Sequence, residues 1–113
     1  MFIILHYKYC HSKDYKQLIG LLSMELSEIR EHLDRLDNAL LTILAERMSF
    51  IPKVAEYKKK TNVQRYQPER EEQILETKEE LAKKLNINPD LARKIFETII
   101  EDSHRIEKEI MGK

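Results

Sequence analysis

The chain has 113 residues, of which 35% are charged and 42% are hydrophobic, with 2 glycines and no tryptophan. This length is typical of one domain. The composition favours helices over sheets, because Glu, Lys and Leu lose little rotamer freedom in a helix. The 20 basic and 20 acidic side chains give a formal net charge of zero, which argues against a nucleic-acid binder, since such proteins usually carry a basic excess. We therefore predict an all-α protein.

The cellular compartment is indicated by what the sequence lacks. The single cysteine, Cys10, excludes an intrachain disulfide framework and fits a reducing compartment. No apolar run approaches the roughly 20 residues of a membrane-spanning helix, and the apolar residues 2–5 are too few for a signal peptide. We expect a cytoplasmic protein without a membrane partner. His6, Cys10 and His11 match no strong zinc spacing, so we expect no metal site.

The first part of the chain differs from the rest. Residues 1–23 contain three of the five tyrosines but no clear helical pattern. We predict an N-terminal extension, residues 1–23, of uncertain structure, followed by a helical domain, residues 24–113. Because Met24 stands just before the regular pattern, an alternative interpretation of the extension is an artefact of start-codon choice.

A long helix is predicted next. Apolar residues recur in steps of three and four, which indicates an amphipathic helix from about Ser27, a fair N-cap, to about Lys60. Pro52 lies inside this helix, where it removes the hydrogen bond to the carbonyl of Met48 and is expected to cause a kink. The apolar line comprises Leu26, Ile29, Leu33, Leu36, Leu40 and Ile43.

Two shorter helices follow. The first should begin at Pro68, because proline suits the first helical turn, and end near Leu85. The stretch Asn88-Pro89-Asp90 supplies a cap, a first-turn proline and a first-turn acid, so it predicts the start of the last helix.

The length of the first helix predicts the assembly. About 34 residues at a rise of 1.5 Å form a rod of roughly 50 Å, whereas a compact domain of about 90 residues is only about 30 Å across. One protomer cannot cover such a rod along its whole length. We therefore expect three helices per chain, one long and two shorter, in an intertwined homodimeric bundle.

Several charged residues stand in or beside the apolar lines. Arg47 lies between Ile43 and Phe50, and a buried cation is costly unless it is paired. On the pattern alone, a functional role for Arg47 and a purely structural one are equally good explanations. In the structural one, the arginine snorkels or pairs with an acid at the end of the line. Arg30 and Lys58 stand at the two ends of a second line, where charges are usually only solvated.

The shorter helices carry further candidates. Arg70 and Glu71 lie in a first turn, where capping and surface charge are the plain alternative. Glu107 continues an apolar line through Ser103, although an exposed acid is common so near a C-terminus. His104 flanks Ser103 and is expected to edge the same cavity.

Together these positions resemble the all-helical chorismate mutase family. Residues 29–47 are similar to the first half of that family's long helix, and Lys58 falls where the family has its catalytic lysine. Residues 68–71 resemble the start of its second helix, and residues 96–103 resemble its third helix. The resemblance runs from residue 26 to about residue 110 without a gap.

The resemblance implies an enzyme that rearranges chorismate to prephenate for phenylalanine and tyrosine synthesis in the shikimate pathway, without a cofactor. Arg47 and Arg70 would hold the two substrate carboxylates, together with Arg30 of the other subunit in a shared site. Lys58 would donate to the breaking ether oxygen and orient a carboxylate. The catalytic residues would be Arg47, Lys58 and Glu107, and the substrate-binding residues would be Arg30, Arg47, Lys58, Gln67, Arg70, Glu71, Ser103 and Glu107.

The remaining implied roles belong to polar residues of the later helices. Glu71 would bind the ring hydroxyl, and Ser103 would support the carboxylate end. Gln67 stands where the family often has aspartate, a tolerable change if the contact is made by the backbone. Glu107 stands where many members have glutamine, and it must be protonated to donate to the ether oxygen. Apolar surroundings favour its neutral form and nearby cations its ionised form, so the sequence leaves its state open.

Two other functions remain open at this point. An isochorismate pyruvate-lyase shares this fold and much of this pocket. A non-catalytic helical dimerisation module, or a regulatory domain that binds an aromatic metabolite, would need none of the arginines and lysines for chemistry.

Overall fold

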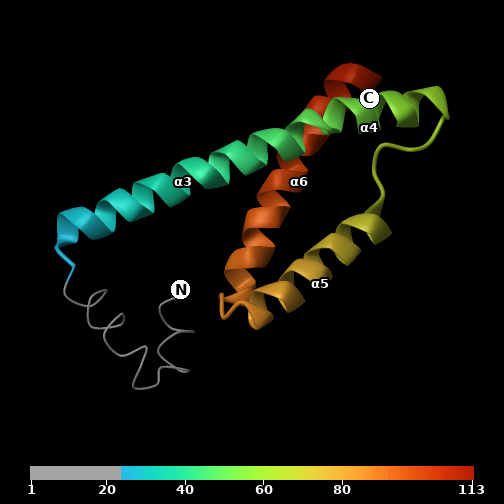
Figure 1. Cartoon of the computed structure of the whole chain (residues 1–113). Helices are drawn as coiled ribbons and strands as arrows, with labels where there is room; N and C mark the ends of the chain where they lie inside the picture. Colours follow the sequence, from blue (N-terminus) through green and yellow to red (C-terminus); the bar gives the residue numbers. More distant parts are fainter. Residues whose placement is uncertain (1–23) are drawn as a thin grey trace. The chain divides into compact units, whose positions relative to one another are not determined.

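The computed structural model describes residues 24–113, and all of the secondary structure in this range is helical. The helices are α3 (Leu26–Ser49), α4 (Ile51–Lys60), α5 (Pro68–Lys84) and α6 (Pro89–Met111) (Figure 1). The predicted all-α class and the three predicted helices are confirmed, with α3 and α4 together forming the long one. The N-terminal extension, residues 1–23, lies outside the described residues. The chain divides into two units, Met1–Thr42 and Ile43–Lys113, and each is described by itself.

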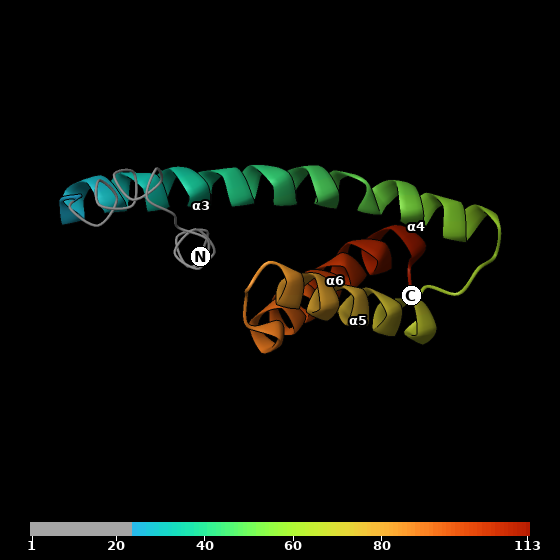
Figure 2. The same ribbon diagram turned by 60° about the horizontal axis from the view of Figure 1, so that its bottom comes forward.

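The long helix is interrupted at Phe50, close to the proline that was expected to disturb it. The backbone N–H of Phe50 donates to the carbonyl of Arg47 at 3.1 Å, which is a three-residue step instead of the usual four. Pro52 lies at the start of α4, where its missing N–H leaves no bond unmade. Helical structure resumes directly after this break (Figure 2).

The helix ends follow local sequence signals, with one exception. The side chain of Asn88 accepts a hydrogen bond from the backbone N–H of Asp90 at 3.0 Å, so the predicted cap of α6 is confirmed. Asn62 and Asn86 adopt φ angles of 59° and 62° just after α4 and α5, a left-handed conformation that asparagine tolerates better than most residues. Ser27 is the exception: α3 begins at Leu26, so Ser27 lies inside the first turn and the predicted N-cap is wrong.

The second unit is built around α6. Helices α5 and α6 lie side by side and run in opposite directions, and α4 lies against the C-terminal part of α6 (Figures 1 and 2). Among the described residues, the buried apolar side chains are Ala55 of α4, Leu75 and Ala82 of α5, and Ile100 of α6. Burial of these side chains therefore holds three helices together with few large residues.

An ion-pair cluster also joins α5 to α6. The guanidinium of Arg93 on α6 donates to Glu72 and Glu79 on α5, and to Glu97 one turn further along its own helix. The hydrogen bonds that Arg93 donates to Glu72 and Glu79 raise the pKa of Arg93 above its ordinary value. This cluster links the part of α5 that carries Glu72 and Glu79 to the start of α6.

Helix α3 keeps its apolar side chains uncovered. No residue of α3 is buried in the single chain, although its apolar line is regular. The helices of the described range include none that is long and apolar enough to cross a membrane. The exposed residues of this line are Leu26, Ile29, Leu33, Leu36, Leu40 and Ile43.

Candidate active site

A cavity of about 230 Å³ lies in the second unit, between the end of α3 and helices α4, α5 and α6. Most of the residues that the sequence singled out line this one cavity. Arg30 is the exception, because it belongs to the first unit, where it is exposed on α3. The polar lining residues are Arg47, Lys58, Gln67, Arg70, Glu71, Ser103, His104 and Glu107, and the apolar ones are Ile51, Val54, Ile74 and Ile100.

Local structure explains how these side chains come to share a cavity. Ser103 and Glu107 are four residues apart on α6, so they lie on one face of that helix. Arg70 and Glu71 lie in the first turn of α5, which Pro68 begins. Because α4 and α5 both pack against α6, residues from distant parts of the sequence line one cavity.

Lys58 and Glu107 form a buried ion pair across the cavity wall. Nζ of Lys58 lies 2.7 Å from Oε1 of Glu107, with side-chain exposures of 16% and 7%. Nζ also donates to the backbone carbonyl of Arg65 at 2.7 Å. An ammonium has three N–H donors, so one remains for another acceptor.

Arg47 is partly buried, close to a second cation and, among the described residues, with one donor unsatisfied. Its Nη1 atom is buried and has no hydrogen-bond partner within residues 24–113. Burial, and secondly the positive charge of Arg70, lower the pKa of Arg47 from its ordinary value. A buried donor without an acceptor costs free energy, so an anion that reached Nη1 of Arg47 would relieve that cost.

Arg70 and Gln67 line the cavity at its solvent-facing side, since both are exposed. Nη1 of Arg70 donates to Oε1 of Gln73 at 2.7 Å, one turn along α5. The side chain of Gln67 donates to the carbonyl of Gln64 at 3.3 Å. Both side chains are therefore bonded to neighbours in their own segment.

Ser103 is buried at the floor of the cavity, with 7% of its surface exposed. Its hydroxyl donates to the carbonyl of Ile99 at 2.9 Å and lies 3.9 Å from the sulfur of Met48. A hydroxyl that bonds back to its own helix has a satisfied donor, and its oxygen can still accept a hydrogen bond.

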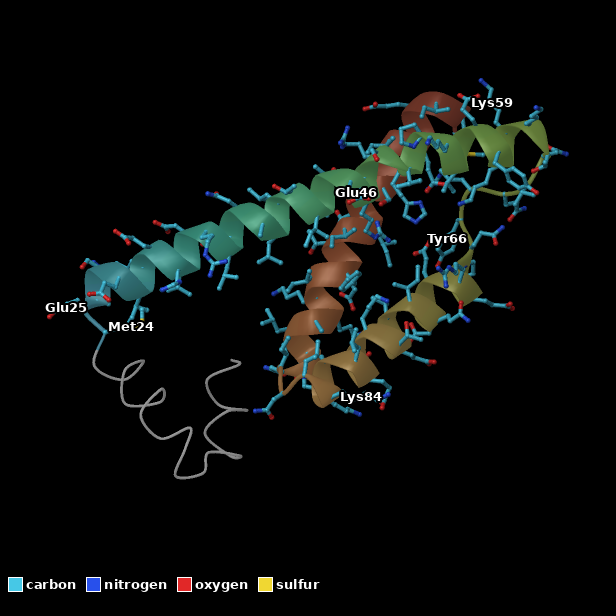
Figure 3. The ribbon with its side chains drawn as sticks, viewed as in Figure 1. Met24, Glu25, Glu46, Lys59, Tyr66 and Lys84 are labelled. Carbon is cyan, nitrogen blue, oxygen red and sulfur yellow. The ribbon has the colours of Figure 1, made fainter. Side chains whose placement is uncertain are left out.

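His104 lines the cavity, as expected from its place beside Ser103, and it links residues of two other segments. Nε2 of His104 lies 2.7 Å from Oε2 of Glu71, and Nδ1 contacts Nη1 of Arg65. The ring of Tyr66, which lies just before α5 (Figure 3), meets the imidazole edge to face, with centroids 6.0 Å apart. Sequence reasoning missed Arg65, because the segment between α4 and α5 has no helical periodicity that would indicate its direction.

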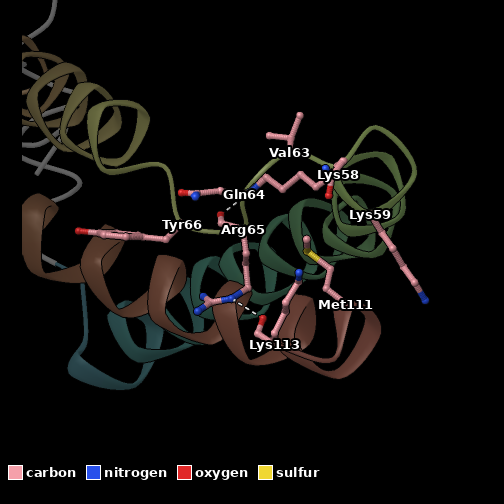
Figure 4. Close-up of a pocket in the computed structure, with 9 residues that line it drawn as sticks. Lys58, Lys59, Val63, Gln64, Arg65, Tyr66, Met111 and Lys113 are labelled. Atoms are coloured by element: carbon pink, nitrogen blue, oxygen red, sulfur yellow. Dashed lines mark hydrogen bonds between the residues drawn. The ribbon is translucent and has the colours of Figure 1, made fainter.

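A second hollow, of about 520 Å³, also has Lys58 in its lining. Its lining includes Lys58, Lys59, Tyr66 and Met111, and Figure 4 shows two of the bonds that cross it. One joins Lys58 to the carbonyl of Arg65, and the other joins Nε of Arg65 to the carbonyl of Lys113 at 2.9 Å. Arg65 is thus held through both its backbone and its side chain.

A metal centre has no support in the described range. Within residues 24–113, no group of three or more His, Cys, Asp or Glu side chains is placed to hold a metal ion. His6, Cys10 and His11, which the sequence argued against as ligands, lie outside the described residues.

Comparison with known proteins decides the family. The profile described as "Chorismate mutase type II" matches residues 29–108. This chain belongs to the chorismate mutase type II family. The matched range contains every residue that was predicted for the site, including Arg30 and Glu107. The resemblance inferred from separated motifs is therefore confirmed at the level of the family.

Individual chorismate mutase relatives differ in how much of their length the chain covers. It is 34% identical over 87 residues to "Chorismate mutase" of Methanocaldococcus jannaschii, which is 77% of this chain and 88% of that protein. It is 32% identical over 89 residues to "Bifunctional chorismate mutase/prephenate dehydratase" of Buchnera aphidicola, covering 79% of this chain but 23% of that protein. It is also 32% identical over 84 residues to "4-amino-4-deoxychorismate mutase" of Streptomyces pristinaespiralis, covering 74% of this chain and 65% of that protein.

Proposed function

We propose that this chain rearranges chorismate to prephenate in the cavity between α4, α5 and α6, as a homodimer whose sites are each completed by Arg30 of the second subunit. Membership of the chorismate mutase type II family supports the reaction. The observation that carries the assignment of the cavity is Nη1 of Arg47, which is buried near Arg70 and has no hydrogen-bond partner among residues 24–113.

The charge of the cavity suits this substrate. Chorismate carries two carboxylates, and the lining contributes the cations Arg47, Lys58 and Arg70. A carboxylate between Arg47 and Arg70 would accept from the orphaned Nη1 and reduce the repulsion between the two guanidiniums. Paired N–H donors of arginine also fix the direction of a carboxylate, so binding and orientation would be achieved together.

Lys58 and Glu107 are the proposed donors to the ether oxygen. Lys58 has one N–H left after its bonds to Glu107 and to the carbonyl of Arg65. Glu107 would have to gain a proton to donate, because an ether oxygen and an ionised carboxylate both only accept. A bound dianion would favour that protonation, since it adds negative charge beside the carboxylate.

The other proposed contacts follow the polar groups of the lining. Glu71 would accept a hydrogen bond from the ring hydroxyl of the substrate, and Ser103 would help to hold a substrate carboxylate. Gln67 would contribute through its backbone or its amide at the mouth of the cavity. Each of these residues lines the same cavity as Lys58, so one substrate could reach all of them.

The reaction depends above all on the conformation of the bound substrate and on the charges that face it. The reaction breaks a carbon–oxygen bond and forms a carbon–carbon bond within one molecule, so no nucleophile is required. Catalysis can come from holding a compact conformer of the substrate and from fixed donors facing the oxygen that gains negative charge. One such donor is typically worth about 3 kcal/mol.

The proposed dimer rests on the uncovered apolar line of α3. Leu33 and Leu40 are 51% and 66% exposed in the single chain, and burying such side chains is worth about 1.5–3 kcal/mol each. A second copy is the proposed cover, because the line has the heptad spacing with which helices pair. Arg30 also belongs to α3, so pairing of the α3 helices would bring Arg30 of each subunit to the site of the other.

The reaction is tested with purified protein and no added cofactor. Loss of chorismate absorbance, with prephenate identified by chromatography, is the expected result. Parallel samples of isochorismate and of 4-amino-4-deoxychorismate separate the alternatives, because a pyruvate-lyase would release pyruvate from the former and an aminodeoxychorismate mutase would prefer the latter. A folded dimer that left all three compounds unchanged would instead favour the non-catalytic module.

A further inference from the structure

His104 is a polar residue of the cavity lining that has no role in the proposed mechanism. It lies on α6 one residue after Ser103, and its side chain is 19% exposed. Nε2 contacts Oε2 of Glu71 on α5. Nδ1 contacts Arg65 in the segment that precedes α5, and it lies 3.9 Å from Oε2 of Glu107, beyond hydrogen-bond distance. The imidazole therefore bridges a cavity-lining carboxylate and a guanidinium.

The partner on Nδ1 decides how the ring is protonated. A guanidinium has only donors and keeps its charge in proteins, so Nδ1 of His104 must accept from Arg65. A ring nitrogen that accepts carries no proton, and the proton of the neutral imidazole is therefore on Nε2. That N–H donates to Glu71 at 2.7 Å. The contact with Arg65 therefore selects the Nε2-protonated tautomer, which can donate to Glu71.

Arg65 is itself fixed in place. Its backbone carbonyl accepts from Lys58 at 2.7 Å, and its Nε donates to the carbonyl of Lys113 at 2.9 Å (Figure 4). These bonds leave Nη1 free to point at His104. The chain of contacts runs from the α4–α5 segment through the imidazole to Glu71, and every link has a defined donor and acceptor.

We infer that His104 is a positioning residue for substrate recognition: it holds Oε2 of Glu71 so that Oε1 is presented to the ring hydroxyl of the substrate. This inference rests on the proposed function. The terminal torsion of a glutamate is broad, so the carboxylate needs a partner to fix its direction. Oε1 of Glu71 has no hydrogen-bond partner within residues 24–113, which leaves it available for the hydroxyl.

The kinetic signature of such a role is specific. The ring hydroxyl does not react, so its contact has the same strength before and during the rearrangement, and losing it should raise KM with little change in kcat. We expect His104→Leu to raise KM for chorismate roughly tenfold, the usual scale for one hydrogen bond to a charged group. A residue that only supported the fold would lower activity together with thermal stability.

A matched pair of variants separates the two nitrogens. His104→Gln places an amide N–H where the imidazole has Nε2, so it should keep the bond to Glu71 and a KM near that of the unchanged protein. His104→Asn reaches only the position of Nδ1, so it should bond to Arg65 alone and behave like His104→Leu. Equal KM values for the Gln and Asn variants would overturn the inference, even if His104→Leu failed to fold.

A double-mutant cycle with Glu71 gives the second readout. If His104 acts through Glu71, His104→Asn should change KM by less than about twofold in a Glu71→Ala background. A full loss in that background, or a loss confined to kcat, would contradict the inference. Turnover by the unchanged protein keeps the two proposals apart: no conversion of chorismate would reject the proposed function, whereas conversion without the KM pattern would reject only the role of His104.

Discussion

Nζ of Lys58 lies 2.7 Å from Oε1 of Glu107, and both side chains are largely buried in the wall of one cavity. The two residues come from α4 and α6, which are held together by this contact and by Ala55 at their packed surfaces. Both residues are proposed donors to the same ether oxygen. In the ligand-free chain they are bonded to each other, so Glu107 must gain a proton and Lys58 must direct its remaining N–H before both can serve that role.

The first prediction concerns Glu107→Gln. A glutamine amide donates at every pH, whereas Glu107 donates only when it is protonated. The rate of the unchanged protein should therefore rise as pH falls, and the Gln variant should have a flatter profile with a rate at least as high near neutrality. Both profiles of rate against pH are measured at one ionic strength, because the site is strongly charged. A folded but inactive Gln variant, or an unaltered profile, would show that Glu107 has another role.

The second prediction concerns stability at Arg47. Removing a buried donor that lacks a partner should raise the free energy of unfolding, so Arg47→Met should gain about 1 kcal/mol while losing activity by about 100-fold or more. Thermal unfolding without substrate and turnover of chorismate are measured at equal protein concentration. Arg70→Met is the matched control: its guanidinium is exposed and bonded to Gln73, so activity should fall with little change in melting temperature. A lower melting temperature for Arg47→Met would mean that the guanidinium is already satisfied.

The third prediction tests the shared site. Arg30→Ala and Arg47→Ala chains should each be inactive as homodimers. In a mixed dimer, one of the two sites has both arginines intact, so mixing the two chains should restore part of the activity. The assay is turnover in dimers verified by two different affinity tags. Absence of recovery in verified mixed dimers would argue that Arg30 does not act across the subunit boundary.

The fourth prediction concerns residues 1–23. The family match begins at residue 29 and α3 begins at Leu26, so a chain that starts at Met24 should keep the complete domain. We expect it to dimerise and to turn over chorismate with the kinetics of the full chain. Size-exclusion chromatography, thermal unfolding and kcat/KM check this. A clear loss in any of them would assign residues 1–23 a contact with the domain.

Some features of this protein depend only on neighbours in the chain, and those were accessible from the sequence. The start of α6 at Asn88-Pro89-Asp90 depends on one hydrogen bond between a side chain and a backbone N–H two residues later. The break near Pro52 follows from the backbone N–H that proline lacks. Helical periodicity likewise brings Ser103 and Glu107 to one face of α6. The start of α3 was predicted to within one residue, but the N-cap at Ser27 was wrong because α3 begins at Leu26, a difference too small for periodicity to resolve.

The tertiary structure decided which of the charged side chains meet. No local rule pairs Lys58 with Glu107 or brings Arg65 to Nδ1 of His104. Nor does a local rule leave Nη1 of Arg47 without an acceptor among residues 24–113. These contacts depend on the path of the segment between α4 and α5 and on the register of α5 against α6. Helix periodicity places residues on faces, but the hydrogen bonds of a site depend on distances between faces, and those arise only when the helices pack.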